Sequence, residues 1–254
     1  MNIHAAPLEK EVTRRTNISL SNFLQNVCVS IAQKNFIFLT QPATQALLNV
    51  SGSDWKAFQD SWNNLEQDMY MKDGGTYRYR RHATYSVEPY GAPRLEPKQP
   101  HFQTLDYNPL NGGVARHFAH IEEGTLSNPA FLSTLGLCAT LFASMAPFYA
   151  WHIEVHQFRI EAQPQGASPT PEGIHRDGVD FVFMMLINRV NVLQGSTRIF
   201  DLRREPLGEF TLTHPMEAAI VNDHHVMHGV TPILPETEDK PGYRDVLVIT
   251  FRKK

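Results

Sequence analysis

The second half of the chain is a succession of short strand-like segments, and this pattern restricts the fold more than any other feature. After Pro147, segments rich in Val, Ile, Phe and Thr alternate with Gly, Pro and Asn. They are WHIEVHQFRIEA, FVFMMLINRVNV, STRIFDL, EFTLTH, AAIVN, HVMHGVTPI and RDVLVITFR. Many short strands separated by turn residues are typical of a β-sandwich or barrel. We therefore expect residues 147–254 to form most of an antiparallel β-core.

The first half of the chain has a mixed pattern. Helical spacing of apolar residues predicts helices over residues 19–31, 44–70 (broken near Gly52) and 128–146, whereas residues 35–40 and 74–87 are strand-like. We expect residues 1–146 to form an α/β part that packs on the core, and residues 1–254 to form a single domain. The predicted fold is mainly β with flanking helices.

Composition restricts the partners of this protein. The 254 residues include 23 Lys and Arg and 26 Asp and Glu, and the formal net charge is −3. Nucleic-acid binding would require a basic face, and a membrane helix would require roughly 20 consecutive apolar residues. The sequence has neither, and no apolar run near the start is long enough for a signal peptide. Cys28 and Cys138 lie in apolar surroundings, which indicates free thiols in a reducing compartment. We expect a cytoplasmic protein without a nucleic-acid or membrane partner.

The stretch PTPEGIHRDGVDF contains the first candidate metal ligands. His175 and Asp177 are two residues apart, and in an extended chain such residues point to the same face. One imidazole and one carboxylate then project together, as in the 2-His-1-carboxylate triad of non-haem Fe(II) oxygenases. A single His-x-Asp pair also arises by chance, as a turn Asp beside a surface His, so a third ligand has to be found.

The third ligand is expected in VNDHHVMHGV, about fifty residues downstream, which contains three histidines. A turn-favouring Asn-Asp pair precedes His224 and His225 and places them at a strand entry near water. His228 lies further inside the strand, and Gly229 behind it lets another backbone segment approach closely. We therefore predict His228 as the ligand. The alternatives are His224 or His225 as the ligand, with His228 as a core histidine bonded to backbone.

Arg244 stands at the start of a strong strand signal, GYRDVLVITFR. Its guanidinium group is a rigid fork that binds carboxylates in bidentate fashion. At a barrel mouth, one strand on from the metal-binding histidine, Arg244 would bind a dicarboxylate cosubstrate. The alternative is a surface arginine paired with an acidic residue across the sheet.

The order His-x-Asp, then a distal His, then an Arg at the start of the last strand resembles that of the Fe(II)/2-oxoglutarate-dependent dioxygenases. The resemblance is closer to the bacterial subgroup that hydroxylates free amino acids, typified by L-isoleucine dioxygenase. The resemblance lies in YNPLNGGVARHF, HQFRI, PTPEGIHRDGVDFV, HGVTPI and YRDVLVITF, and it spans most of the chain from about Arg78 onward. One position departs from the wider superfamily, in which many members have Ser or Thr two residues after the arginine. Here that position is Val246.

By position, the resemblance implies that His175, Asp177 and His228 bind Fe(II) and that Arg244 binds the C5 carboxylate of 2-oxoglutarate. It also implies a double-stranded β-helix, a jelly-roll and cupin-like core, in agreement with the strand pattern. The implied reaction couples oxidative decarboxylation of 2-oxoglutarate by O2 to hydroxylation of a small, aliphatic, free L-amino acid.

The residues that bind the substrate are less constrained. A free amino acid needs a cation for its carboxylate and an anion or carbonyl group for its ammonium. Gln157 and Arg159 share a face of the WHIEVHQFRI segment, just before the metal-binding stretch, and we predict them as substrate-binding residues, with a structural role as the alternative. Further cations in nearby stretches are Arg78, Arg80, Arg81 and Arg116.

A second class of function fits the same metal-binding pattern. A cupin-like barrel can bind a metal and a small ligand without oxidising it, as an isomerase or a ligand-binding protein. The two classes differ at Arg244, which a 2-oxoglutarate enzyme needs and such an isomerase does not. The pattern leaves open which amino acid and which carbon react, and the oligomeric state.

Overall fold

A computed structural model describes residues 20–254, so the predicted helix start at residue 19 lies outside the described residues. The main element is an eight-stranded antiparallel sheet. Its strands are β1 (Phe36–Leu39), β2 (Glu66–Gln67), β3 (Arg78–Val87), β4 (Arg94–Leu95), β5 (Trp151–Glu161), β6 (Phe181–Val190), β10 (Ala218–Asn222) and β13 (Tyr243–Lys253). The spatial order is β1-β10-β6-β13-β5-β3-β2, and β4 pairs with β3.

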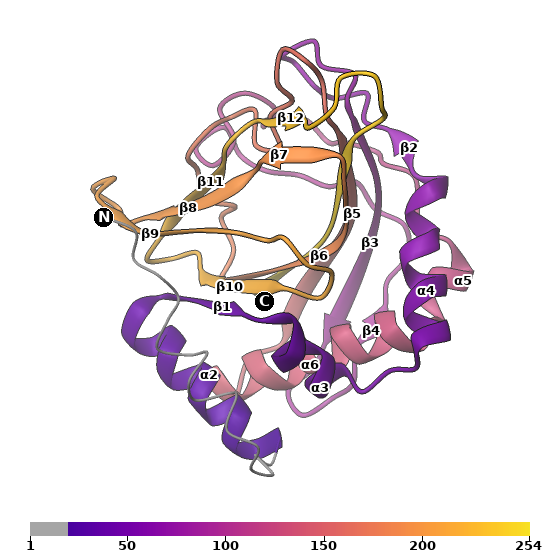
Figure 1. Ribbon diagram of the computed structural model, residues 1–254. Coiled ribbons are helices and arrows are strands. Elements are labelled where there is room, and N and C mark those ends of the chain that lie inside the picture. Colours follow the sequence, from indigo (N-terminus) through magenta and orange to yellow (C-terminus); the bar gives the residue numbers. More distant parts are fainter. Residues whose placement is uncertain (1–19) are drawn as a thin grey trace.

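Two small sheets face this large sheet. One has the order β11 (Met227–Val230), β8 (Ser196–Phe200) and β9 (Pro206–Thr211), and the other pairs β12 (Ile233–Pro235) with β7 (Val192–Gln194). Figure 1 shows β7, β8 and β11 opposite β3, β5 and β6 across the interior of the molecule. The mainly β fold that the sequence predicts is confirmed.

Helices cover the outer face of the large sheet (Figure 1). They are α2 (Leu20–Lys34), α3 (Gln41–Leu48), α4 (Gly52–Asp60), α5 (Glu123–Leu126) and α6 (Pro129–Met145), with a 3-10 turn η1 (Ser61–Asn64). The helix expected over residues 44–70 is too long, because the helical region ends at Asn64 and Glu66–Gln67 pair with β3 instead. Within residues 20–254, no helix combines the length and the apolar character needed to cross a membrane.

The start of α6 shows how sequence fixes these helices. Asn128 precedes the first turn, and its side-chain oxygen accepts hydrogen bonds from the backbone N–H groups of Ala130 (2.8 Å) and Phe131 (3.4 Å). Pro129 occupies the first helical position, where its missing N–H costs nothing. The helix then buries Phe131, Leu135 and Phe142 against the sheet.

Side chains alternate between the two faces of the large sheet, and this alternation separates the core from the interior cavity. In β6, Phe183 and Met185 pack with the helices, whereas Val182 and Met184 face the small sheets. β5 follows the same rule, with its odd-numbered residues toward the helices and its even-numbered residues toward the interior.

Strands from both halves of the chain share the large sheet. β1, β2 and β3 come from residues 1–146 and lie beside strands from residues 147–254. We propose that residues 1–254 form one domain, and the shared sheet supports this proposal.

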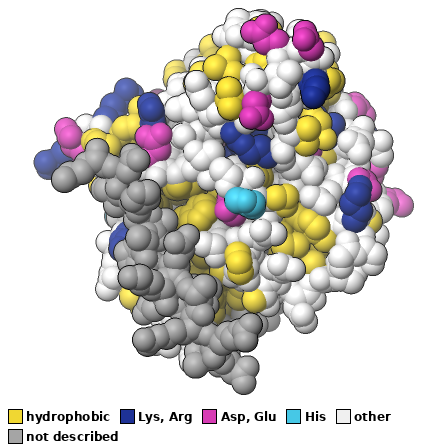
Figure 2. Space-filling view, in the orientation of Figure 1, with side chains coloured by type: hydrophobic (Ala, Val, Ile, Leu, Met, Phe, Trp, Pro, Cys, Tyr) yellow, Lys and Arg dark blue, Asp and Glu magenta, His cyan; other side chains and the backbone are white. Residues whose placement is uncertain are grey.

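The outer surface carries charges of both signs. On the face shown in Figure 2, Lys and Arg side chains lie in separate small groups, several of them beside Asp or Glu side chains. This mixture agrees with a formal net charge of only −3 for the whole chain.

Replacing the capping residue of α6 should weaken the fold. Asn128→Ala removes the acceptor for two backbone N–H groups and should lower the free energy of unfolding by about 1 kcal/mol, measured by urea denaturation. Ser144→Ala is the control, because the exposed Ser144 hydroxyl only donates back to Thr140 within the same helix and its loss should change stability by less than about 0.5 kcal/mol. Equal stability of the two variants would contradict the capping role.

Candidate active site

The two histidines predicted as ligands are joined by their backbones. His175 lies in the segment between β5 and β6, and His228 lies in β11. Each donates its backbone N–H to the carbonyl oxygen of the other, both at 2.9 Å. Their imidazole rings lie with centroids 4.7 Å apart, and both side chains are buried. The structure thus brings together residues more than fifty positions apart, as the sequence predicted.

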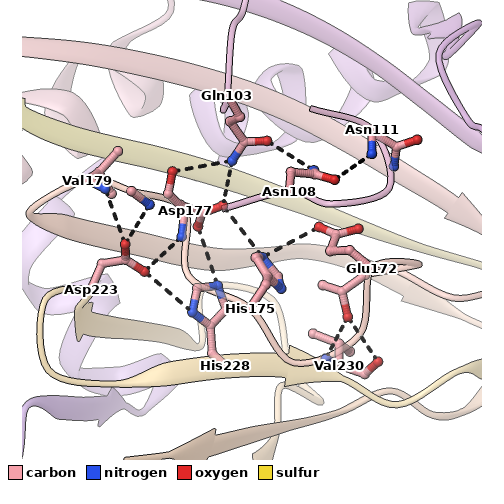
Figure 3. A network of polar contacts seen from close by, with 12 residues as sticks. Gln103, Asn108, Asn111, Glu172, His175, Asp177, Val179, Asp223, His228 and Val230 are labelled. Carbon is pink, nitrogen blue, oxygen red and sulfur yellow. Dashed lines mark hydrogen bonds and ion pairs between the residues drawn. The ribbon is translucent and has the colours of Figure 1, made fainter. Parts of the chain in front are cut away.

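Asp177 completes a group of three metal-binding side chains. One oxygen of Asp177 lies 3.6 Å from His175 Nε2 and the other lies 3.4 Å from His228 Nε2 (Figure 3). One donor atom from each of the three residues lies within 4.8 Å of the others. Two imidazole nitrogens and a carboxylate oxygen are the donor set of a non-haem Fe(II) site.

The surroundings of Nδ1 in the two histidine rings suit metal binding through Nε2. His175 Nδ1 lies 3.0 Å from the carbonyl oxygen of Gly173, which can only accept, so Nδ1 carries the proton and Nε2 is free to coordinate. His228 Nδ1 is buried and has no hydrogen bond to any residue in the described part of the chain. It faces the Asp223 carboxylate at 3.9 Å. The other ring nitrogen of each histidine, Nε2, is directed at Asp177.

The electrostatics of the group favour a cation at its centre. Burial alone would lower the pKa of His175, but the hydrogen bond and charge of Asp177, together with Glu172, raise it to about 10. Burial alone would raise the pKa of Asp177, but His175 and His228 hold it well below its ordinary value. Both directions indicate a site that stabilises added positive charge, which a divalent metal ion would supply.

Asp223 fixes the backbone next to Asp177. Its two carboxylate oxygens accept the backbone N–H groups of Asp177 (3.0 Å), Gly178 (2.8 Å) and Val179 (3.2 Å). Asp223 is 1% exposed, and burial together with the nearby Asp177 charge raises its pKa. The sequence showed Asp223 only as a turn residue, and nothing in its local pattern indicated this contact across the site.

Gly229 allows the close approach that the sequence predicted. A Cβ atom at this position would lie 3.2 Å from the carbonyl oxygen of Gly173 and 3.4 Å from Cα of Ile174. A larger residue would therefore push the segment that carries His175 away from β11. The expectation that Gly229 admits another backbone segment is confirmed.

A set of amide side chains holds Asp177 from the other side (Figure 3). Gln103 Nε2 lies 3.3 Å from Asp177 Oδ1, and Gln103 Oε1 accepts hydrogen bonds from Asn108 Nδ2 (3.1 Å) and Arg116 Nη2 (2.8 Å). Sequence reasoning missed Gln103 and Asn108, because the segment between them forms no regular element whose periodicity would show a shared face.

The group opens into a cavity of about 550 Å³ between the large sheet and the small sheets. This volume lies within the usual range for sites that bind small molecules. Apolar side chains of β5, β6 and β13 form much of its wall, among them Phe158, Met184, Val246 and Val248. Buried charged groups interrupt this apolar lining at a few points.

Arg244 is one of these charged groups. It is 4% exposed, and its Nε has no hydrogen-bond partner in the structure of residues 20–254. Burial, with the nearby positive charge of Arg189, lowers the pKa of Arg244 to about 10 although Asp245 opposes this. Val246, two residues on, also lines the cavity and offers no hydroxyl group. A buried guanidinium with an unused donor is a site for a carboxylate ligand.

Gln157 and Arg159 do not reach the cavity, and the prediction that they bind substrate is corrected. Both are odd-numbered residues of β5 and point to its helix-facing side. Gln157 Nε2 donates to Ser61 Oγ at 2.9 Å, and Arg159 forms a bidentate pair with Asp245 at 2.7 and 2.8 Å. These contacts engage both side chains outside the cavity.

The two other histidines of the VNDHHVMHGV stretch lie outside the group. His224 and His225 belong to the turn before β11 and are exposed. His224 Nε2 pairs with Asp180 at 3.0 Å, away from Asp177. Their predicted position at a strand entry near water is confirmed.

A second group of potential metal ligands, the histidine–glutamate cluster, lies in the same region. It consists of His82, His101, Glu154 and His156. Arg80 Nη2 lies 2.7 Å from His156 Nδ1, and a guanidinium can only donate, so His156 carries its proton on Nε2 and directs it at Glu154, 3.4 Å away. Hydrogen bonds from His101 and its neighbours outweigh burial and hold the pKa of Glu154 well below its ordinary value. Contacts with Arg80 and with imidazole rings thus occupy His156 and Glu154, whereas His82 Nε2 is buried and has no hydrogen-bond partner among the described residues.

The fold and the site together define a class, the jelly-roll oxygenases with a 2-His-1-carboxylate site. Residues 59–250 match the family model described as 2OG-Fe dioxygenase, so the chain belongs to the 2OG-Fe dioxygenase family. This family uses Fe(II), 2-oxoglutarate and O2, and the chain is a 2-oxoglutarate-dependent dioxygenase with the double-stranded β-helix core that the sequence predicted.

Three known proteins illustrate this similarity. The chain is 28% identical to 3(1)-hydroxy-L-isoleucine 4-dioxygenase of Pantoea ananatis (strain AJ13355), over 76% of this chain and 78% of that protein. It is also 28% identical to L-isoleucine-4-hydroxylase of Bacillus thuringiensis, over 87% and 89%. The crystal structure of a bsmA homolog from Methylobium petroleophilum PM1 is 34% identical, with a TM-score of 0.82 over 90% of this chain and 92% of that one.

Removing one acceptor of Asp223 should weaken metal binding. Asp223→Asn can no longer hold all three backbone N–H groups of residues 177–179, and affinity for Fe(II) should fall about 10- to 100-fold, measured by anaerobic calorimetry. Asp201→Asn is the matched control, since Asp201 accepts the backbone N–H groups of Arg203 and Glu205 in a turn outside the cavity. Unchanged Fe(II) affinity in Asp223→Asn would show that Asp223 does not position the ligands.

Proposed function

We propose that this dioxygenase hydroxylates a small, aliphatic, free L-amino acid, with Fe(II) bound by His175, Asp177 and His228. The observation that carries the proposal is the meeting of these three donors at a cavity that also contains the buried Arg244. Bound Fe(II) would supply the activation of O2, coupled to decarboxylation of 2-oxoglutarate to succinate and insertion of one oxygen atom into a substrate C–H bond.

The protein's residues would position the reactants. Arg244 would bind the C5 carboxylate of 2-oxoglutarate, because its guanidinium is buried and its Nε unpaired. Asp223 and Gln103 would hold Asp177 from two sides. The apolar wall, which includes Phe158, Val246 and Val248, would keep water away from the reacting carbon.

The substrate class has two supports. The names of the two enzymes at 28% identity refer to isoleucine or hydroxyisoleucine. The cavity wall also carries Val, Ile, Met and Phe side chains, which suit an aliphatic group. Family membership favours this function over the alternative of a cupin-like isomerase or ligand-binding protein.

We also propose a cytoplasmic location, which the free thiols of Cys28 and Cys138 support.

A substrate panel tests the function directly. The protein, supplied with Fe(II), 2-oxoglutarate and O2, should form succinate with at least one aliphatic L-amino acid, and mass spectrometry should detect a product heavier by one oxygen atom. His228→Ala should abolish this activity because a metal ligand is lost, whereas His225→Ala, a change in the exposed turn, should retain most of it. Folded, iron-loaded protein that produces no succinate with any amino acid would refute the proposal.

Loss of the Arg244 charge should weaken cosubstrate binding. Arg244→Gln removes a charge-assisted contact with the carboxylate and should raise the Kd for 2-oxoglutarate by about 10- to 100-fold, measured by anaerobic calorimetry with Fe(II) present. Arg198→Gln is the control, because Arg198 is half exposed and pairs with Glu209. Both of these residues lie on a small sheet, whereas Arg244 lies on the large one. Equal affinities in wild type and Arg244→Gln would favour a function that does not use 2-oxoglutarate.

A further inference from the structure

Two buried arginines of the cavity have no acidic partner. Among residues 20–254, no carboxylate oxygen lies within 4.0 Å of the side-chain nitrogens of Arg116 or Arg244. By contrast, Arg78 in the same cavity pairs with Asp68 at 2.8 Å. A buried charge without a partner is costly, so each of the two arginines calls for an anionic ligand. Under the proposed function, 2-oxoglutarate would satisfy Arg244, and Arg116 is left for a second carboxylate.

Arg116 lies one side chain away from the metal-binding group. It is 2% exposed and lines the cavity. Its Nη2 donates to Gln103 Oε1 at 2.8 Å, and Gln103 Nε2 lies 3.3 Å from Asp177 Oδ1. Its Nε is buried and has no hydrogen-bond partner in the part of the chain that the structure describes. A carboxylate bound here would lie close to the reacting centre.

Glu172 presents the opposite charge on another side of the same group. Its side chain is 10% exposed, and Oε1 lies 3.6 Å from His175 Nε2. Its second oxygen, Oε2, is buried without a hydrogen-bond partner in the described chain. Figure 3 shows Gln103, the residue that Arg116 contacts, and Glu172 on different sides of the Asp177–His175 pair. Glu172 lines the cavity, and its carboxylate has one oxygen without a hydrogen-bond partner among the described residues.

Arg116 and Glu172 lie close enough to interact electrostatically. Burial and the positive charge of Arg78 lower the pKa of Arg116, while the charges of Asp68, Glu172 and Glu154 oppose this. Arg116 and Glu172 nevertheless form no ion pair with each other within 4.0 Å. A guanidinium and a carboxylate that are near neighbours, but not in contact, leave room for a molecule that carries both complementary charges.

We infer that Arg116 and Glu172 together bind the zwitterionic head group of the substrate, with the α-carboxylate on Arg116 and the α-ammonium on the carboxylate of Glu172. This inference rests on the proposed function and names the residues that would restrict it to free amino acids. An amino acid held at both charges has its β- and γ-carbons close to the metal-binding group. A peptide bond at either end would remove one of the two charges.

Besides Glu172 and the metal-binding Asp177, Glu154 is the acidic residue that lines the cavity, and its surroundings make it less suited to the ammonium. One of its oxygens faces His101 and His156, and the other lies 3.3 Å from His152 Nε2. The acceptor positions of Glu154 are therefore occupied by imidazole N–H groups, whereas Glu172 Oε2 is unpaired. This comparison makes Glu154→Gln a useful variant beside Glu172→Gln.

The test pairs each variant with a ligand that lacks the complementary charge. The probes are L-isoleucine, L-leucine and L-methionine, each with its 2-oxo acid, which lacks the ammonium, and its decarboxylated amine, which lacks the carboxylate. Binding is measured by calorimetry under nitrogen to protein saturated with Fe(II) and 2-oxoglutarate. In wild type, loss of either charge should weaken binding by about 10- to 100-fold.

The expected result is a loss of discrimination that is specific to each variant. Glu172→Gln should bind the amino acid about 10- to 100-fold more weakly and should no longer prefer it over the 2-oxo acid. Arg116→Gln should no longer prefer the amino acid over the amine. Both should retain wild-type affinity for 2-oxoglutarate, which Arg244 binds under the proposed function. Arg203→Gln and Glu209→Gln, at exposed positions, are the matched controls.

Each other outcome overturns a defined part of the inference. If Glu154→Gln abolishes the ammonium preference and Glu172→Gln does not, the ammonium binds at the histidine–glutamate cluster. If Arg116→Gln weakens 2-oxoglutarate binding instead, Arg116 belongs to the cosubstrate site. If wild type oxidises an amino acid but both variants keep their preferences, only the inference fails. If wild type neither binds nor oxidises any amino acid, the proposed function fails, and the inference with it.

Discussion

The site depends on the pair of backbone hydrogen bonds between His175 and His228. This bridge joins the loop after β5 to the small sheet that contains β11, and bridge partners place their side chains next to each other. Asp223 extends the same constraint by accepting the N–H groups of residues 177–179. The three donor atoms are thus positioned mainly by main-chain hydrogen bonds, which an ordinary surface loop would lack. Burial of the bridge also excludes water, which would otherwise compete for these bonds.

Much of the fold and the metal-binding group could be predicted from the sequence, because local rules apply there. Segments rich in β-branched and aromatic residues, separated by turn residues, revealed the strands of the second half, and helical spacing of apolar residues over residues 128–146 located α6. The i, i+2 spacing placed His175 and Asp177 on one face, and the turn before β11 separated His228 from its two exposed neighbours. The resemblance to a family then linked stretches about fifty residues apart, which alternation alone could not do.

The residues around the metal-binding group escaped prediction because their positions depend on tertiary structure. Gln157 and Arg159 share a face, as predicted, but it is the face that packs on the helices. The apolar residues Trp151 and Ile153 have the same parity and would have indicated this. No such signal existed for Gln103 or Glu172, which lie in segments without regular periodicity. An unpaired buried charge such as Arg116 becomes visible only when the partners of every side chain are known.

The cavity has two walls that are built by different parts of the chain. The metal-binding side chains come from residues 175–177 and β11, whereas the opposite wall belongs to β3, β5 and β13. Among the hydrogen bonds and ion pairs of residues 20–254, none joins the side chain of His152 or Phe158 in that wall to the bridge or to Asp223. The volume and polarity of the substrate space can therefore be altered independently of the scaffold that holds the metal. One reactive centre could thus be adapted to new substrates by exchanging a few strand positions.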